Sequence, residues 1–167
     1  ALKINRTITS LNLSMNGIED VAALAQVIPY NRSLRWCCVL WNKISDGGAL
    51  AIAGSERRAA GVQFTLTGLA DTATKVELPR ERLQSADGVL IASELGSSRN
   101  LTIVDLAFNE LGPSAAVALA AALRESESLT QLNLEANRLS GTWWEFGVQV
   151  GVRDVSGMLA LASCLEQ

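Results

Sequence analysis

The chain has 167 residues, of which 49% are hydrophobic and 19% are charged, with a formal net charge of −3 and an isoelectric point near 5.0. This composition excludes a disordered tail, because it supplies enough apolar material for a buried core. The acidic balance argues against a nucleic-acid partner, and no apolar run reaches the roughly 18 residues that a membrane-spanning helix needs.

Four segments share one strand-and-turn pattern, L-x-x-L-x-L-x-x-N-x-L in single letters. They begin at Ile8, Leu34, Leu101 and Leu129, with Cys37 and Val39 as apolar substitutes in the second copy. The asparagine of the pattern is Asn16, Asn42, Asn109 or Asn137. Alternating apolar positions over such a short run predict strands with one buried face.

An Ala- and Leu-rich stretch follows each turn, and its periodicity predicts a helix. These stretches cover residues 20–28, 47–59, 87–95 and 114–126. One unit is therefore strand, turn, helix and return, and units of 26 to 28 residues indicate a stacked repeat architecture.

The repeated pattern resembles the leucine-rich repeat family, in its ribonuclease-inhibitor-like subclass with long units. The resemblance implies an α/β fold: a curved solenoid of about four or five repeats, with parallel strands on the concave face and helices on the convex face. We expect the solenoid to span residues 1–141, with an irregular insertion near 60–75 and a C-terminal capping segment at 142–167.

A structural role is expected for the four repeat asparagines. In such repeats the side chain can satisfy backbone groups left free where the strand turns away. Losing one asparagine of this ladder is predicted to cost about 1–3 kcal/mol, the penalty for unpaired buried groups.

The repeat is interrupted between Asn42 and Asn109. Two strand candidates, 61–69 and 73–83, lie only 12 residues apart, which is too few for a complete unit between them. We therefore expect one to be the ladder strand and the other an insertion. The second is slightly favoured, because it places Glu81 a full 28 residues before Asn109.

The C-terminal segment is also irregular. Val148, Val150 and Val152 alternate as in a strand or hairpin, and 158–167 has a helical pattern. A cap that shields the last unit is the favoured interpretation, because solenoid ends need one. The alternative is a partner contact made by Trp143, Trp144 and Phe146, since aromatic residues are enriched at binding hot spots.

The sequence offers little material for catalysis. It contains no histidine, which excludes Ser-His-acid triads and most zinc centres, and no phosphate-binding glycine loop is present. Neighbouring strand residues point to opposite faces, so Cys37 is expected inside and Cys38 outside. We expect no enzyme activity, cofactor or metal.

The predicted concave face is the candidate binding surface. It combines aromatic and other apolar residues with acidic and amide ones, a mixture that suits a protein partner. Its members are Trp36, Cys38, Trp41, Glu77, Ile103, Asp105, Phe108, Gln131, Asn133 and Glu135.

These observations predict a non-catalytic protein–protein interaction module, a scaffold or structural subunit within a larger assembly. The expected partners are other proteins, with no nucleic acid and no direct membrane insertion. The alternative is a regulator of a small GTPase, by analogy with Ran GTPase-activating proteins, and a stimulated rate of GTP hydrolysis would support it. Localisation stays open. With three cysteines, an odd number, the chain cannot pair all of them in internal disulfides, which favours an intracellular location over secretion.

Overall fold

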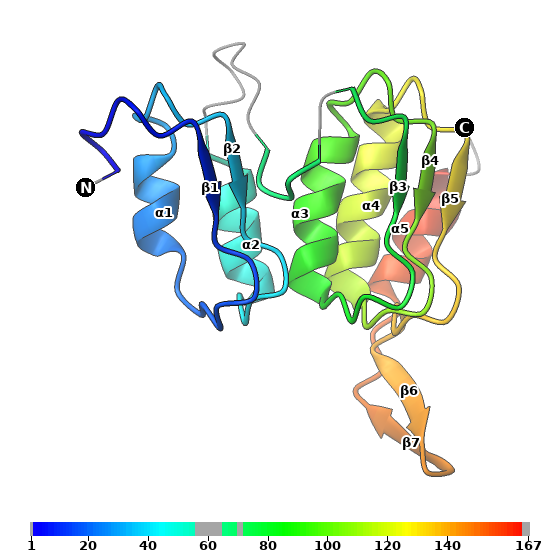
Figure 1. Ribbon diagram of the computed structural model, residues 1–167. Helices are drawn as coiled ribbons and strands as arrows, with labels where there is room; N and C mark the ends of the chain where they lie inside the picture. The colour runs from blue at the N-terminus through cyan, green and yellow to red at the C-terminus, as the bar shows by residue number, and fades with distance from the viewer. Residues whose placement is uncertain (1, 56–64, 70–71, 165–167) are drawn as a thin grey trace.

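A computed structural model describes residues 2–55, 65–69 and 72–164. Helices and short strands alternate along the chain, and a hairpin near the C-terminus extends away from the rest (Figure 1). The mixed helix and strand content confirms an α/β fold.

The first sheet consists of β1 (Ser10–Asn12) and β2 (Trp36–Cys38), which pair in parallel. Leu11 lies opposite Cys37, so the apolar pattern positions are in register. Thr65 extends this sheet by a single parallel bridge to Trp36, supported by a hydrogen bond from the Cys37 N–H to the Thr65 carbonyl oxygen at 2.9 Å.

The second sheet has three parallel strands in chain order, β3 (Lys75–Glu77), β4 (Ile103–Asp105) and β5 (Gln131–Asn133). Val76, Val104 and Leu132 occupy matching positions in the register. Val76 and Val104 are buried, and Leu132 at the last strand is half-buried. The central residue of each strand therefore faces the helices, as period-two alternation predicts.

Within the described residues, five helices pack in chain order behind these strands: α1 (Ala22–Val27), α2 (Asp46–Ala53), α3 (Ser85–Leu95), α4 (Pro113–Glu125) and α5 (Ser156–Cys164). Small residues allow neighbouring helices to pack closely. A Cβ added to Gly88 would lie 2.6 Å from the Cβ of Ala115, so α3 and α4 approach closely where neither has bulk.

Local start signals explain where two of these helices begin. The Ser45 hydroxyl accepts a hydrogen bond from the Gly48 N–H at 3.1 Å and caps α2. At α3, Gln84 and Asp87 form a reciprocal capping box. The sequence-based ranges 20–28, 87–95 and 114–126 differ from the structure by one or two residues at their ends, where capping rather than periodicity decides the boundary. The range 47–59 is longer than α2, which ends at Ala53, and its residues 56–59 lie outside the described residues, as do 165–167 of the range 158–167.

Each repeated turn has a residue in the left-handed backbone region at the same position of the pattern. These residues immediately precede the pattern position of the asparagine, with φ angles of 53° to 63°: Met15, Trp41, Arg80, Phe108 and Ala136. Non-glycine residues seldom adopt this conformation, because Cβ crowds the backbone. Its recurrence at five equivalent positions shows that Arg80 and Glu81 belong to the same turn type as the asparagine-containing copies.

The two competing strand candidates both pair, which corrects the expectation that one would be an insertion. Val76 continues the sheet towards β4, and Thr65 continues the sheet from β2. No pairing joins β2 or Thr65 to β3 among the described residues, so the strands form two separate parallel groups. Residues 61–64 of the first candidate lie outside the described residues.

The C-terminal segment is more regular than its sequence suggests. β6 (Thr142–Glu145) and β7 (Val148–Gly151) form an antiparallel hairpin. Phe146 and Gly147 make its two-residue turn with φ angles of 48° and 82°. Positive φ at both turn residues is the geometry that matches strand twist, so Trp143 and Trp144 lie in a strand rather than an irregular loop.

The last helix, α5, packs on α4. Gly157 allows the close approach, since a Cβ there would lie 2.5 Å from the Cβ of Ala116. Near the other end of α5, the Cys164 thiol donates a hydrogen bond to the Ala120 carbonyl oxygen at 3.1 Å. This helix covers the flank of α4, while the hairpin points away from it (Figure 1). The division at 141 and the capping role of 142–167 stay predictions.

Candidate functional site

The second sheet aligns the predicted binding residues in two columns. The β3–β4–β5 register places Lys75, Ile103 and Gln131 side by side, and it does the same for Glu77, Asp105 and Asn133. Glu77, Gln131, Asn133 and Glu135 are exposed, while Ile103 and Asp105 are half-buried. Adjacent strands lie about 4.8 Å apart, so each column is a continuous stripe that a partner can contact.

Two polar members of these columns also shape their own turns. The Asp105 carboxylate accepts a hydrogen bond from the Ala107 N–H at 2.9 Å, and the Asn133 side-chain oxygen accepts one from the Glu135 N–H at 3.1 Å. Part of their hydrogen-bonding capacity is therefore used locally. Glu77 and Glu135 are exposed carboxylates whose negative charge faces solvent on the same side.

Two arginine side chains stack on aromatic rings near the turns that follow the strands of this sheet. The Arg80 guanidinium lies 4.5 Å from the centre of the Phe108 ring, and Arg138 lies 4.3 Å from the Trp143 ring. Arg138 also forms an ion pair with Glu110 at 2.8 Å. Phe108 retains 41% of its surface exposed beside Arg80, so one face of its ring is held while the rest stays accessible.

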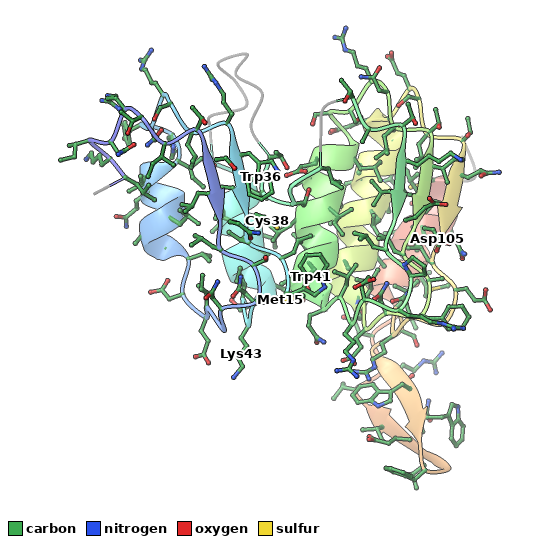
Figure 2. The ribbon with its side chains drawn as sticks, in the orientation of Figure 1. Met15, Trp36, Cys38, Trp41, Lys43 and Asp105 are labelled. Atoms are coloured by element: carbon green, nitrogen blue, oxygen red, sulfur yellow. The ribbon has the colours of Figure 1, made fainter. Side chains whose placement is uncertain are left out.

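The aromatic residues of the first sheet have a different setting (Figure 2). Trp36 packs against Gly68, where an added Cβ would lie 2.9 Å from the indole ring. Trp41 donates its indole N–H to the Glu81 carbonyl oxygen at 2.9 Å. Both tryptophans are half-buried. Trp41 therefore helps connect the two strand groups, a role that its predicted exposure did not indicate, whereas Trp36 packs within the first group.

Cys38 is the clearest departure from the predicted surface. It is 5% exposed, and its thiol donates a hydrogen bond to the Thr67 carbonyl oxygen at 3.3 Å. The prediction that it faces outward is wrong, because Thr65–Leu69 lies against β2 on that side. We therefore remove Cys38 from the set of binding residues.

Two acidic residues of α3, Asp87 and Glu94, were missed by the sequence reasoning; they lie at the junction between the two strand groups, where α3 contacts Trp41 and Thr65–Leu69. The Asp87 carboxylate accepts hydrogen bonds from the N–H groups of Trp41 and Gln84, both at 2.9 Å. Glu94 accepts bonds from the Leu66 and Thr67 N–H groups and from the hydroxyls of Thr65 and Thr67. The Gln84-x-x-Asp87 capping pattern signalled the position of Asp87 at a helix start, but nothing local signalled a bond to residue 41.

The repeat asparagines hydrogen bond to the turn of the preceding unit. The Asn42 side-chain oxygen accepts from the Asn16 and Ile18 N–H groups, and the Asn109 and Asn137 oxygens accept from the Leu83 and Leu111 N–H groups, all at 3.0 Å. Asn16 lies in the first unit and donates to the Ser14 carbonyl oxygen at 2.9 Å.

A model of the Leucine Rich repeat family matches residues 5–25, 41–53 and 97–120. These three segments are similar to leucine-rich repeats. The matched segments include parts of the first, second and fourth strand–helix units, so the leucine-rich repeats lie on both sides of the junction. No curated protein matches the chain.

The hairpin that follows β5 carries the three predicted tail residues, which differ in exposure. Trp143 is half-buried beneath Arg138, whereas Trp144 is 74% exposed and Phe146, at the turn, is fully exposed. The strand alternation places Trp143 and Trp144 on opposite faces of the hairpin. The three residues therefore do not form one patch.

The described residues offer no group of three or more histidine, cysteine, aspartate or glutamate side chains that could hold a metal ion. Across the same part of the chain, every helix is too short or too polar to span a membrane.

We predict that Cys37 and Cys38 resist alkylation in the folded protein. Burial raises the pKa of the Cys37 thiol to about 12, and burial also raises the pKa of Cys38. Because the thiolate is the reactive form, iodoacetamide at pH 8 should modify both residues only as fast as the protein unfolds. Peptide mass spectrometry over time measures this, with a urea-unfolded sample as the control. Rapid labelling of folded Cys37 would contradict the prediction.

Proposed function

We propose that this chain is a non-catalytic protein–protein interaction module that binds a partner through the strand face of β3, β4 and β5. Leucine-rich repeat domains generally mediate interactions between proteins. We further propose that the module acts as a scaffold or structural subunit within a larger assembly, because a repeat surface of this kind has extended columns rather than a closed pocket.

The aligned columns are the observation that carries this proposal. Glu77 and Asp105 lie side by side in the register, and the half-exposed Phe108 lies at the turn that follows β4. Adjacent carboxylates favour a partner segment with lysine or arginine, and an aromatic anchor favours an apolar side chain in the same segment. The expected partner is therefore a protein segment that is basic and partly apolar.

The long-repeat, ribonuclease-inhibitor-like subclass and a curved solenoid form part of the same proposal. Their support is a full helix in each unit and parallel pairing within both strand groups. In a curved arrangement the strand columns would lie on the concave side, where a partner gains contact with several units at once.

Affinity capture of partner proteins tests this proposal. It compares three baits: the wild-type chain, a Glu77→Lys/Phe108→Ala double variant, and Glu127→Lys. Alanine suits position 108, because Ala136 adopts the same backbone conformation in the next unit. Glu127 is exposed in the link between α4 and β5, so Glu127→Lys applies the same charge reversal away from the strand face. Circular dichroism verifies that all three baits are folded.

Quantitative mass spectrometry of the captured proteins provides the readout. We expect the double variant to recover specific partners about tenfold less efficiently, which corresponds to roughly 1.4 kcal/mol of binding free energy. Glu127→Lys should recover them as the wild type does. Equal recovery by all three folded baits would reject binding through this face.

A further inference from the structure

The outer edge of β7 differs from the edge of the second sheet at β3. β3 ends its sheet with Lys75 and Glu77 and is followed by Pro79, and these residue types discourage pairing with another chain. β7 reads Val-Gln-Val-Gly, and no charge lies between Val148 and Val152. Natural proteins seldom leave an uncharged, valine-rich edge uncovered.

Hairpin geometry determines which backbone groups of β7 are available. Next to a two-residue turn, the closing pair Glu145 and Val148 is a hydrogen-bonded pair. Further along the hairpin, non-hydrogen-bonded and hydrogen-bonded pairs alternate. Val148 and Val150 therefore direct their backbone groups at β6. Gln149, opposite Trp144, directs its N–H and C=O outward, away from the hairpin.

Exposed apolar side chains are frequent in the hairpin and in the segment that follows it. Of the fourteen exposed large hydrophobic side chains among the described residues, seven lie between Trp144 and Leu159. Val148 is 63% exposed and Val152 is 84% exposed. A two-stranded hairpin is marginally stable in water, so added strands would stabilise it.

We propose that β7 pairs with β7 of a second copy of this chain, in an antiparallel arrangement about a two-fold axis at Gln149. The two Gln149 residues would exchange both backbone hydrogen bonds. Val148 of each copy would lie opposite Val150 of the other, and the two hairpins would form one four-stranded sheet.

The edge itself favours a second copy over an unrelated segment. A strand pairs with itself about a two-fold axis when its side chains match across that axis, and β7 places valine opposite valine on both sides. Its lack of charge gives a charged partner segment no electrostatic advantage. The contact is small, so the dimer is expected to be reversible and concentration-dependent. The proposal does not depend on the strand face of β3–β5.

Analytical ultracentrifugation from low micromolar to near-millimolar concentration tests this dimer. We expect the wild-type mass to rise from 17.8 kDa towards twice that value. Gln149→Lys places like charges together at the axis and should raise the dissociation constant about tenfold or more. Gln149 is exposed, so the variant keeps the hairpin intact.

Gln131→Lys is the matched control. It places the same substitution at an exposed position on β5, the outer strand of the second sheet, and should dimerise like the wild type. Concentration-dependent protection of the Gln149 amide from hydrogen exchange would support pairing at this residue. A wild-type mass that stays at 17.8 kDa, or equal dimerisation of Gln149→Lys, would overturn the proposal.

Discussion

Replacing Asn109 with leucine is expected to lower the free energy of unfolding by about 3 kcal/mol, the upper end of the penalty for unpaired buried groups. The Asn109 side chain accepts from the Leu83 N–H at 3.0 Å and donates to the carbonyl oxygens of Leu78 and Leu106 at 2.8 and 3.0 Å. The leucine side chain has the same number and branching of heavy atoms but no polar atom. The Leu83 N–H, in a residue with no exposed surface, would lose its acceptor.

Asn16→Leu is the matched control for this prediction. It changes the same position of the repeat, but the Asn16 side chain is exposed and, among the described residues, bonds only within its own turn. We expect its effect to stay within about 0.5 kcal/mol, as for ordinary surface substitutions. Urea unfolding monitored by tryptophan fluorescence measures both variants. Equal losses for Asn16→Leu and Asn109→Leu would show that the hydrogen bonds between neighbouring units are not the source of the stability.

The repeat units could be predicted because their signals are local and periodic. Each unit on its own shows a strand pattern of period two followed by an apolar helical pattern. The helices α1 to α4 lie in the regions that this pattern predicts. The columns on β3, β4 and β5 follow from the same register, since matching pattern positions pair in the structure. Sequence reasoning works here because neighbouring units share the same sequence pattern and fold in the same way.

The junction could not be predicted, because its contacts join residues that no repeat relates. Whether Cys38 is exposed depends on Thr65–Leu69, whose path is set by Glu94 on α3. A strand pattern predicts on which face of the sheet a side chain lies, but it does not predict whether another segment covers that face. Periodicity also gave no sign that Thr65 and Val76 would join different sheets.

Asp87→Asn is expected to destabilise the protein by about 1–2 kcal/mol at neutral pH, because one buried hydrogen bond is lost. Asp87 is buried at the start of α3, where its two oxygens accept from the Trp41 and Gln84 N–H groups. An asparagine oxygen can replace one acceptor, but its amide group would face the second N–H as a donor. The turn of the second unit would then be held less firmly against α3.

The pH dependence of this loss identifies the carboxylate as the cause. Burial raises the pKa of Asp87 above its ordinary value, and this effect exceeds the opposing effect of the two backbone hydrogen bonds. Between the ordinary and the raised pKa, the folded protein holds a proton that the unfolded chain releases. Stability from this group therefore rises as pH falls through that window and declines as pH rises through it.

Asparagine does not titrate, so the stability difference between wild type and Asp87→Asn should widen as pH falls from 7 towards about 4. Taking the difference between the two proteins cancels the contribution of the other carboxylates. Urea unfolding at several pH values measures it, with Asp46→Asn as a control at an aspartate in the first turn of α2. A difference that stays constant or narrows on acidification would mean that Asp87 is not a buried carboxylate at the junction, and the connection between the two strand groups would have to rest on Trp41 and Glu94 instead.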